Sequence, residues 1–130
     1  MMDHEKPDVY PVTLDLVTQI GKLLKSKGSD RSLRDQVVRS STSILLNIAE
    51  GTGKRSSADR RRYYDIARGS AMETAAALDV LVAWDYIIQA QSDECKSLLR
   101  RVVAMLTRMT EVPASAVHEE FTEYGIKASH

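Results

Sequence analysis

The stretch NIAEGTGKRS, residues 47–56, contains the residue types of a phosphate-binding loop: two glycines, then lysine, arginine and serine. A P-loop requires a glycine, four residues, Gly-Lys and then a hydroxyl side chain, placed between a buried strand and a helix. If Gly53 and Lys54 are the Gly-Lys pair, Ile48 stands at the first glycine position and Arg55 at the hydroxyl position. The stretch therefore fails the motif. We interpret it as a helix end at Gly51, a turn and the start of the next helix.

Other catalytic constellations are also incomplete. Residues 118–120 begin like the HExxH zinc motif, but position 122, where the second histidine belongs, is a threonine. The histidines lie near the chain ends, at positions 4, 118 and 130, so none is placed to activate Cys95 or a serine. Glu50 and Glu73 lack the Glu-x-x-His pattern of di-iron bundles. We predict no enzyme activity, no metal and no cofactor, and interpret Cys95 as a packing residue on a buried stripe.

A polar stripe runs along the second predicted helix. At about 100° per residue its members fall in one narrow arc, and they are Gln36, Arg39, Ser43, Asn47 and Glu50. This composition, with little lysine, favours a hydrogen-bond network at a helix boundary or a subunit contact, and the alternative is an ordinary solvated face. If the second and third helices fold back on each other, Arg39 lies within about a turn of Glu73, so we predict an ion pair between them.

Positive charge is concentrated near the start of the third predicted helix, although the formal net charge is zero. This basic cluster, opposed there only by Asp59 and Asp65, comprises Lys54, Arg55, Arg60, Arg61, Arg62 and Arg68. Neutrality argues against a surface built throughout for polyanions, but the cluster is a candidate contact for RNA or DNA, with Tyr63 and Tyr64 beside it to stack on bases. The alternative is a solvated helix start, with Tyr63 in the core.

Four amphipathic segments must position these residues. The three prolines lie near the chain ends, so the centre is free to be helical. Apolar spacings of three and four, with capping residues between them, predict helices over about 8–26, from Ser29–Ser32 to Gly51, from Ser56 or Ser57 to about Gln89, and from Ser92 to Pro113. In the third helix the predicted core seam is Tyr63, Ala67, Ser70, Thr74, Ala77, Leu81, Trp84 and Ile88.

Short connections between four helices predict an all-α, antiparallel up-down-up-down four-helix bundle. We expect one domain over residues 1–130, with the bundle at about 8–112 and a mobile acidic tail at about 113–130. One cysteine, no signal-like leader and no apolar run of about 20 residues predict a cytoplasmic protein without membrane contact.

Two motifs together resemble the signature of a known family. The first contains Arg39, Ser43-Ile44 and residues 47–51 followed by Gly53-Lys54, and the second is residues 66–70 with Glu73. This order and separation resemble the four-helix-bundle family named after reading frames in rRNA intervening sequences, which also takes in relatives of the accessory proteins of diversity-generating retroelements. The resemblance covers about residues 9–110.

The resemblance implies a bundle that assembles into a ring, typically a pentamer, with no known catalytic residues. For the accessory relatives it also implies a basic surface that holds nucleic acid together with a reverse transcriptase. The chain departs from those relatives because it is neutral where they are strongly basic. It also has Lys54 where the family more often has arginine.

We therefore expect a non-enzymatic homo-oligomer, a pentamer, that acts as a scaffold or adaptor and contacts RNA, DNA or a reverse-transcriptase-like protein through the basic cluster. Leu46, which lies beside the polar stripe and away from the core arc, suits a subunit interface. The alternative is a regulatory protein, such as the antitoxin half of a pair, that docks another protein on the ring face or through its acidic tail and has no nucleic-acid role.

Overall fold

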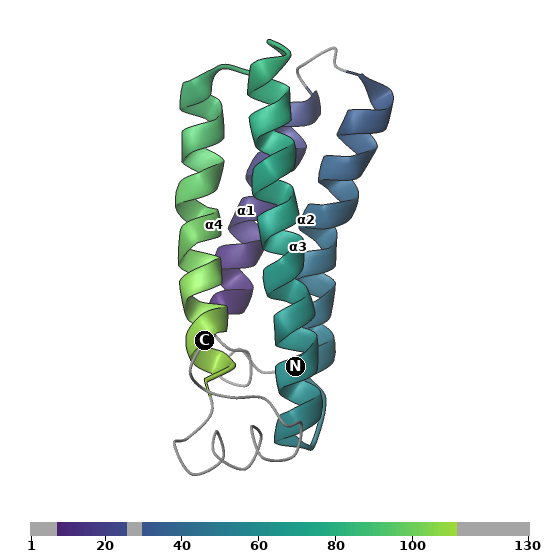
Figure 1. Ribbon diagram of the computed structural model, residues 1–130, viewed down its shortest axis with the longest axis vertical. Coiled ribbons are helices and arrows are strands. Elements are labelled where there is room, and N and C mark those ends of the chain that lie inside the picture. The colour runs from purple at the N-terminus through teal and green to yellow at the C-terminus, as the bar shows by residue number, and fades with distance from the viewer. Residues whose placement is uncertain (1–7, 26–29, 112–130) are drawn as a thin grey trace, which may run out of the picture.

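The computed structural model describes residues 8–25 and 30–111. Within them lie four helices, α1 (Val9–Lys25), α2 (Arg31–Thr52), α3 (Ser57–Ala83) and α4 (Gln89–Met109), and no strand. Consecutive helices run in opposite directions, and α1 also packs against α4 (Figure 1). The predicted all-α, up-down-up-down bundle is confirmed. The predicted mobile tail at about 113–130 lies outside the described residues.

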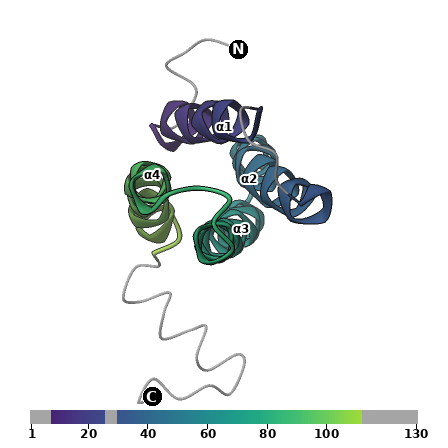
Figure 2. The same ribbon diagram turned by 90° about the horizontal axis from the view of Figure 1, so that it is seen from above.

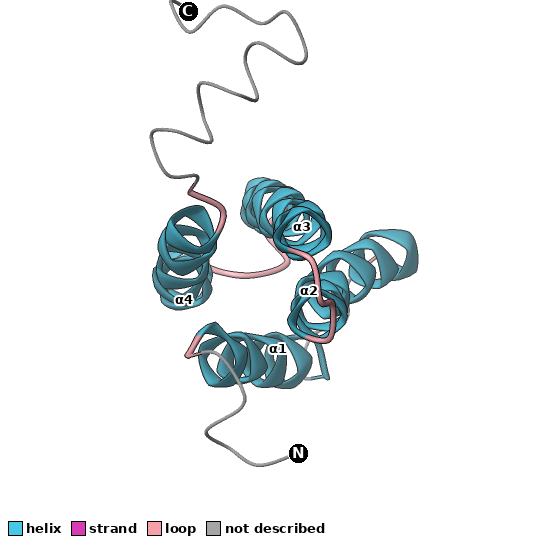
Figure 3. Ribbon diagram, turned by 90° about the horizontal axis from the view of Figure 1, so that it is seen from below, coloured by secondary structure: helices cyan, strands magenta, loops and turns pink. Residues whose placement is uncertain are grey.

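The helices surround one core in the order α1, α2, α3, α4, as the two end-on views show (Figures 2 and 3). The most extensive contact is between α2 and α3. Because these are also the two longest helices, the α2–α3 turn projects beyond the nearby ends of α1 and α4, at the bottom of Figure 1. No helix in the described ranges is long and apolar enough to cross a bilayer.

The core is built from apolar residues that recur every three or four positions on each helix, which buries one stripe per helix. Its fully buried large members include Leu16, Ile20, Val37, Ile44, Ile48, Leu78, Leu81, Val102 and Leu106. Between α2 and α3 the buried side chains include small polar ones, and the Thr74 hydroxyl donates a hydrogen bond to the Ser40 hydroxyl at 2.9 Å. Such small groups let the two helices approach closely.

The α2–α3 turn differs from the prediction in the role of its glycines. Helix α2 begins after Asp30, whose carboxylate accepts the Leu33 N–H at 2.9 Å. It continues through Gly51 and ends at Thr52, with Gly53 as its C-cap. Gly51 is therefore a buried helical residue and not the helix end. An ideal Cβ there would lie 2.8 Å from Cε1 of Tyr64, so packing, and not helix termination, accounts for this glycine.

The prediction for the α3–α4 boundary was wrong by about six residues at the end of α3 and by three at the start of α4. Helix α3 ends at Ala83, short of Gln89, and α4 begins at Gln89, before Ser92. Asp85 reverses the chain with a φ of 62°, a left-handed conformation that aspartate tolerates. Trp84 and Ile88 consequently lie exposed in the turn and not in the core seam.

The start of the predicted core seam on α3 also needs correction. Tyr64, and not Tyr63, is buried there. The Tyr64 hydroxyl lies 3.0 Å from Oγ1 of Thr52, which ties the first turns of α3 to the end of α2. Tyr63 lies half-buried at the surface, so its ring is available to neighbouring cations.

Candidate functional site

Polar side chains join α2 to α3 along one edge of their contact. The hydroxyls of Ser43 and Ser70 lie 2.8 Å apart, and the Asn47 amide donates to the carbonyl and hydroxyl oxygens of Ser43 at 2.8 and 3.1 Å. About two turns toward the start of α2, the Gln36 amide donates to the Glu73 carboxylate. Three members of the polar stripe thus take part in hydrogen bonds at the α2–α3 boundary.

The predicted ion pair between Arg39 and Glu73 does not form within the chain. Among residues 8–25 and 30–111, no hydrogen bond or ion pair involves the Arg39 side chain, which is exposed. Gln36 and Arg39 point about 60° apart around the helix, and Gln36 is the residue that reaches Glu73. Glu50, the last member of the stripe, pairs with Lys54 at 3.3 Å on the surface.

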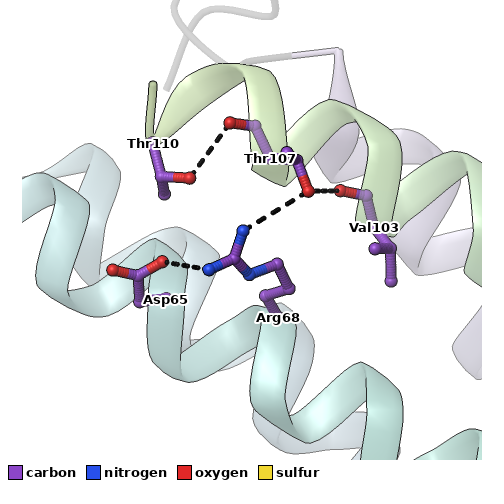
Figure 4. A network of polar contacts seen from close by, with 5 residues as sticks. All are labelled: Asp65, Arg68, Val103, Thr107 and Thr110. Atoms are coloured by element: carbon purple, nitrogen blue, oxygen red, sulfur yellow. Dashed lines mark hydrogen bonds and ion pairs between the residues drawn. The ribbon is translucent and has the colours of Figure 1, made fainter. Parts of the chain in front are cut away.

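Two arginines of the basic cluster support the fold. Arg60 Nη1 donates to the carbonyl oxygens of Lys54 and Arg55 at 2.8 and 2.9 Å, which clamps the α2–α3 turn. Arg68 pairs with Asp65 at 3.0 Å and reaches Oγ1 of Thr107 on α4 at 3.5 Å (Figure 4). The Arg60 contacts have no sequence signature because the acceptors are backbone carbonyls, and the Arg68–Thr107 contact has none because the partner is on another helix. Asp65 and Arg68, by contrast, stand at the i,i+3 spacing of a helix ion pair.

The other cations of the basic cluster gather at the projecting end. The Lys54 ammonium lies 5.2 Å and the Arg62 guanidinium 5.1 Å from the centre of the Tyr63 ring, distances typical of cation–π contacts. Arg55 is exposed in the turn, and Arg61 lies half-buried in the next turn of α3. An aromatic ring in contact with two cations, next to a projecting turn, is an arrangement that can accept a base and its phosphate.

A second surface combines apolar and charged side chains. On α2, Leu46 is 64% exposed and lies within about 20° of Arg39 on the helix surface. On α3, which runs beside α2, Ile66 is 45% exposed and lies within about 20° of Glu73. We call these four residues together with Gly69 the α2–α3 face.

No contact within the described part of the chain requires a glycine at position 69 on this face. Gly69 lies in the middle of α3, where glycine costs about 1 kcal/mol relative to alanine. Among residues 8–25 and 30–111, nothing lies within 4 Å of the position that its Cβ would occupy. The site is therefore open for close approach by another molecule.

The remaining reactive group lies in the core. Cys95 is buried on α4, and this burial, with a smaller contribution from Glu94, raises the pKa of its thiol. The thiol is therefore neutral at physiological pH and packs as a small apolar group. Within the part of the chain that the structure describes, no group of three or more His, Cys, Asp or Glu side chains is arranged to hold a metal ion.

Comparison with known proteins finds a matching family and a similar solved structure. The model of the 23S rRNA-intervening sequence protein family matches residues 5–108. The chain is similar to a crystal structure of a protein with unknown function from the S23 ribosomal protein family of Bacteroides thetaiotaomicron VPI-5482, with 26% identity and a TM-score of 0.75. That match covers 80% of this chain and 99% of the other. No curated protein matches.

Proposed function

The chain belongs to the 23S rRNA-intervening sequence protein family, and from this premise we propose that it is a non-enzymatic homo-oligomer that acts as a scaffold or adaptor. The observation that carries the proposal is the α2–α3 face, which exposes Leu46 and Ile66 beside an open glycine. An apolar patch bordered by charged residues is typical of a protein interface. The proposed assembly is a ring of five copies.

The charges on the face support contact between copies. Arg39 on α2 has no side-chain partner among the described residues, and Glu73 on α3 accepts a hydrogen bond only from the neutral Gln36. In a ring, the α2 edge of one copy meets the α3 edge of the next copy. This is a heterologous contact, and its repetition closes the ring. The Arg39–Glu73 pair that does not form within one chain is then available between neighbours.

Gly69→Ala tests whether the open glycine serves assembly. In the separate bundle the substitution is expected to raise the free energy of unfolding by about 0.5–1 kcal/mol, because alanine is the better helix former. In the assembly the added methyl group is expected to weaken association about tenfold, a cost of roughly 1.4 kcal/mol. Urea unfolding at low protein concentration and sedimentation equilibrium measure the two effects.

Gly21→Ala is the matched control for this experiment. Gly21 lies in α1, away from the α2–α3 face, and its Cβ position is equally open. The control is expected to stabilise the bundle similarly and to leave association unchanged. Equal association of Gly69→Ala, Gly21→Ala and the wild type would contradict an interface at Gly69.

The adaptor role is assigned to the basic end of the molecule. Lys54 and Arg62 lie against the Tyr63 ring, and Arg55 is exposed nearby in the sequence, at the turn that projects from the bundle. A ring repeats this group once per copy, so weak phosphate and stacking contacts add up to a usable affinity. The ligand class that suits this chemistry is single-stranded RNA or DNA.

Charge reversal at the turn tests this role. Arg55→Glu combined with Arg62→Glu is expected to weaken binding of a fluorescent single-stranded RNA at least tenfold at low salt and to flatten the salt dependence. Arg60 is left intact because it clamps the turn. Fluorescence anisotropy across a salt series measures both quantities.

The control variant makes the same change in net charge at the other end of α2. It combines Arg31→Glu with Arg34→Glu, near the start of that helix, and is expected to retain binding. An equal loss of RNA binding in the two double variants would show that binding responds only to the net charge of the protein. Absence of salt-dependent binding to the wild type, for RNA and DNA, would contradict the nucleic-acid role and favour a regulatory protein that binds another polypeptide.

A further inference from the structure

A groove runs between α3 and α4, on the other side of α3 from its contact with α2. Its volume is about 550 Å³, and small and apolar side chains, among them Ala75, Leu99 and Val103, line it. Met72 stands at its edge with 61% of its surface exposed. The shape and lining are those of a site that receives an apolar side chain from another segment.

The charges that line the groove are positive. Lys96 and Arg100 both belong to α4, and Lys96 already forms an ion pair with Asp79 on α3. No ion pair or hydrogen bond among the described residues involves the Arg100 side chain, which is exposed. An occupant that combines apolar anchors with carboxylates would complement both the lining and this cation.

The chain contains a segment with that chemistry. Residues 112–130 hold three glutamates, at 119, 120 and 123, against one lysine, Lys127. Val117, Phe121 and Tyr124 recur at spacings of four and three, the pattern of anchors in a helix that binds a groove. The glutamates lie between and beside these anchors, so one segment supplies both the apolar and the acidic groups.

The length of the chain allows this segment to reach the groove. Arg100 lies nine residues before the end of α4 at Met109, which is about 14 Å along the helix. Phe121 follows Met109 by twelve residues, and an extended chain of that length spans up to about 40 Å. The segment can therefore turn back along α4 without unwinding it.

We propose that the C-terminal segment, residues 112–130, docks in the α3–α4 groove of its own chain, with Phe121 against Met72 and the glutamates at 119 and 120 facing Arg100. Docking buries the apolar lining of the groove and pairs the exposed arginine. An acidic, apolar peptide from another protein must displace the segment to use the same groove. This inference does not depend on the α2–α3 face or on nucleic-acid binding.

Nuclear magnetic resonance of the full chain tests the proposal directly. Phe121 is the only phenylalanine in the sequence, so a nuclear Overhauser effect from its ring to the Met72 methyl group is unambiguous once Met72→Leu has assigned that methyl. In protein with ¹³C-methyl methionine and protonated phenylalanine in a deuterated background, we expect this effect in the wild type. Arg100→Glu is expected to reduce it at least fivefold, and Glu119→Lys with Glu120→Lys is expected to restore it in that variant.

Arg101→Glu is the matched control, because Arg101 is exposed on the same helix but does not line the groove. It is expected to leave the effect unchanged, and far-ultraviolet circular dichroism verifies that every variant folds. Absence of the effect in the wild type, or equal intensity in Arg100→Glu and Arg101→Glu, would overturn the proposal. An effect seen between methionine-labelled chains and separately labelled phenylalanine chains would also overturn it, because the occupant would then be the segment of a second copy.

Discussion

Replacing Gly51 by alanine is expected to lower the free energy of unfolding by about 1–3 kcal/mol. The added Cβ would lie 2.8 and 3.0 Å from Cε1 and Cδ1 of the Tyr64 ring and 3.1 Å from Cβ of Tyr63. The Tyr64 ring is buried and its hydroxyl is hydrogen-bonded to Thr52, so the ring cannot move away without losing contacts. Urea unfolding followed by circular dichroism measures the change.

Gly53→Ala is the control for this substitution, two residues along the same turn. Its Cβ would meet backbone oxygens at 3.6 and 3.8 Å, which are ordinary contacts, and its φ of −82° suits alanine. The expected change is within about 0.5 kcal/mol. Tyr64→Leu in the Gly51→Ala background should relieve part of the cost, so the two substitutions together should cost less than their sum. Equal effects at positions 51 and 53 would contradict the close approach of Tyr64.

Replacing Leu46 by glutamate is expected to convert the proposed assembly into single bundles while leaving each bundle folded. The side chain is 64% exposed in one chain, so a charge there should change the stability of the bundle by less than about 0.5 kcal/mol. In an interface the same charge would be buried without a partner, at a cost of several kcal/mol per contact. Each contact is then expected to weaken by about 100-fold or more.

Leu14→Glu is the control for the loss of assembly expected in Leu46→Glu. Leu14 is 47% exposed and lies on α1, outside the α2–α3 face. Light scattering coupled to size exclusion should give single bundles for Leu46→Glu and the wild-type mass for Leu14→Glu. The interface is misplaced if both variants retain the wild-type mass or if both lose it.

The fold follows from features that are strong in the sequence. Apolar residues at spacings of three and four mark each buried stripe, and capping residues such as Asp30 mark helix starts. The α3–α4 boundary could not be found in this way, because apolar residues from Trp84 to Ile88 continue the spacing through the turn. The chain reversal depends on the left-handed backbone conformation of Asp85, and no sequence pattern marks that conformation.

The candidate site is less predictable because it depends on how the helices rotate against each other. Helical periodicity places Gln36 and Arg39 in the same arc of α2. A rotation of the helix by about 60° decides which of the two side chains contacts Glu73. The same dependence on helix rotation explains why Tyr63 was predicted in the core although Tyr64 is the buried residue. Side-chain pairing across helices is set by packing, whereas sequence periodicity defines only the face.

The mass of the wild-type protein in solution distinguishes a ring of five copies from a single bundle. Multi-angle light scattering across a range of micromolar concentrations should give five times the chain mass of 14.5 kDa, in agreement with a closed ring built on the α2–α3 face. A mass of one chain throughout that range would contradict the homo-oligomer, and with it the function proposed for Leu46, Gly69 and Arg39.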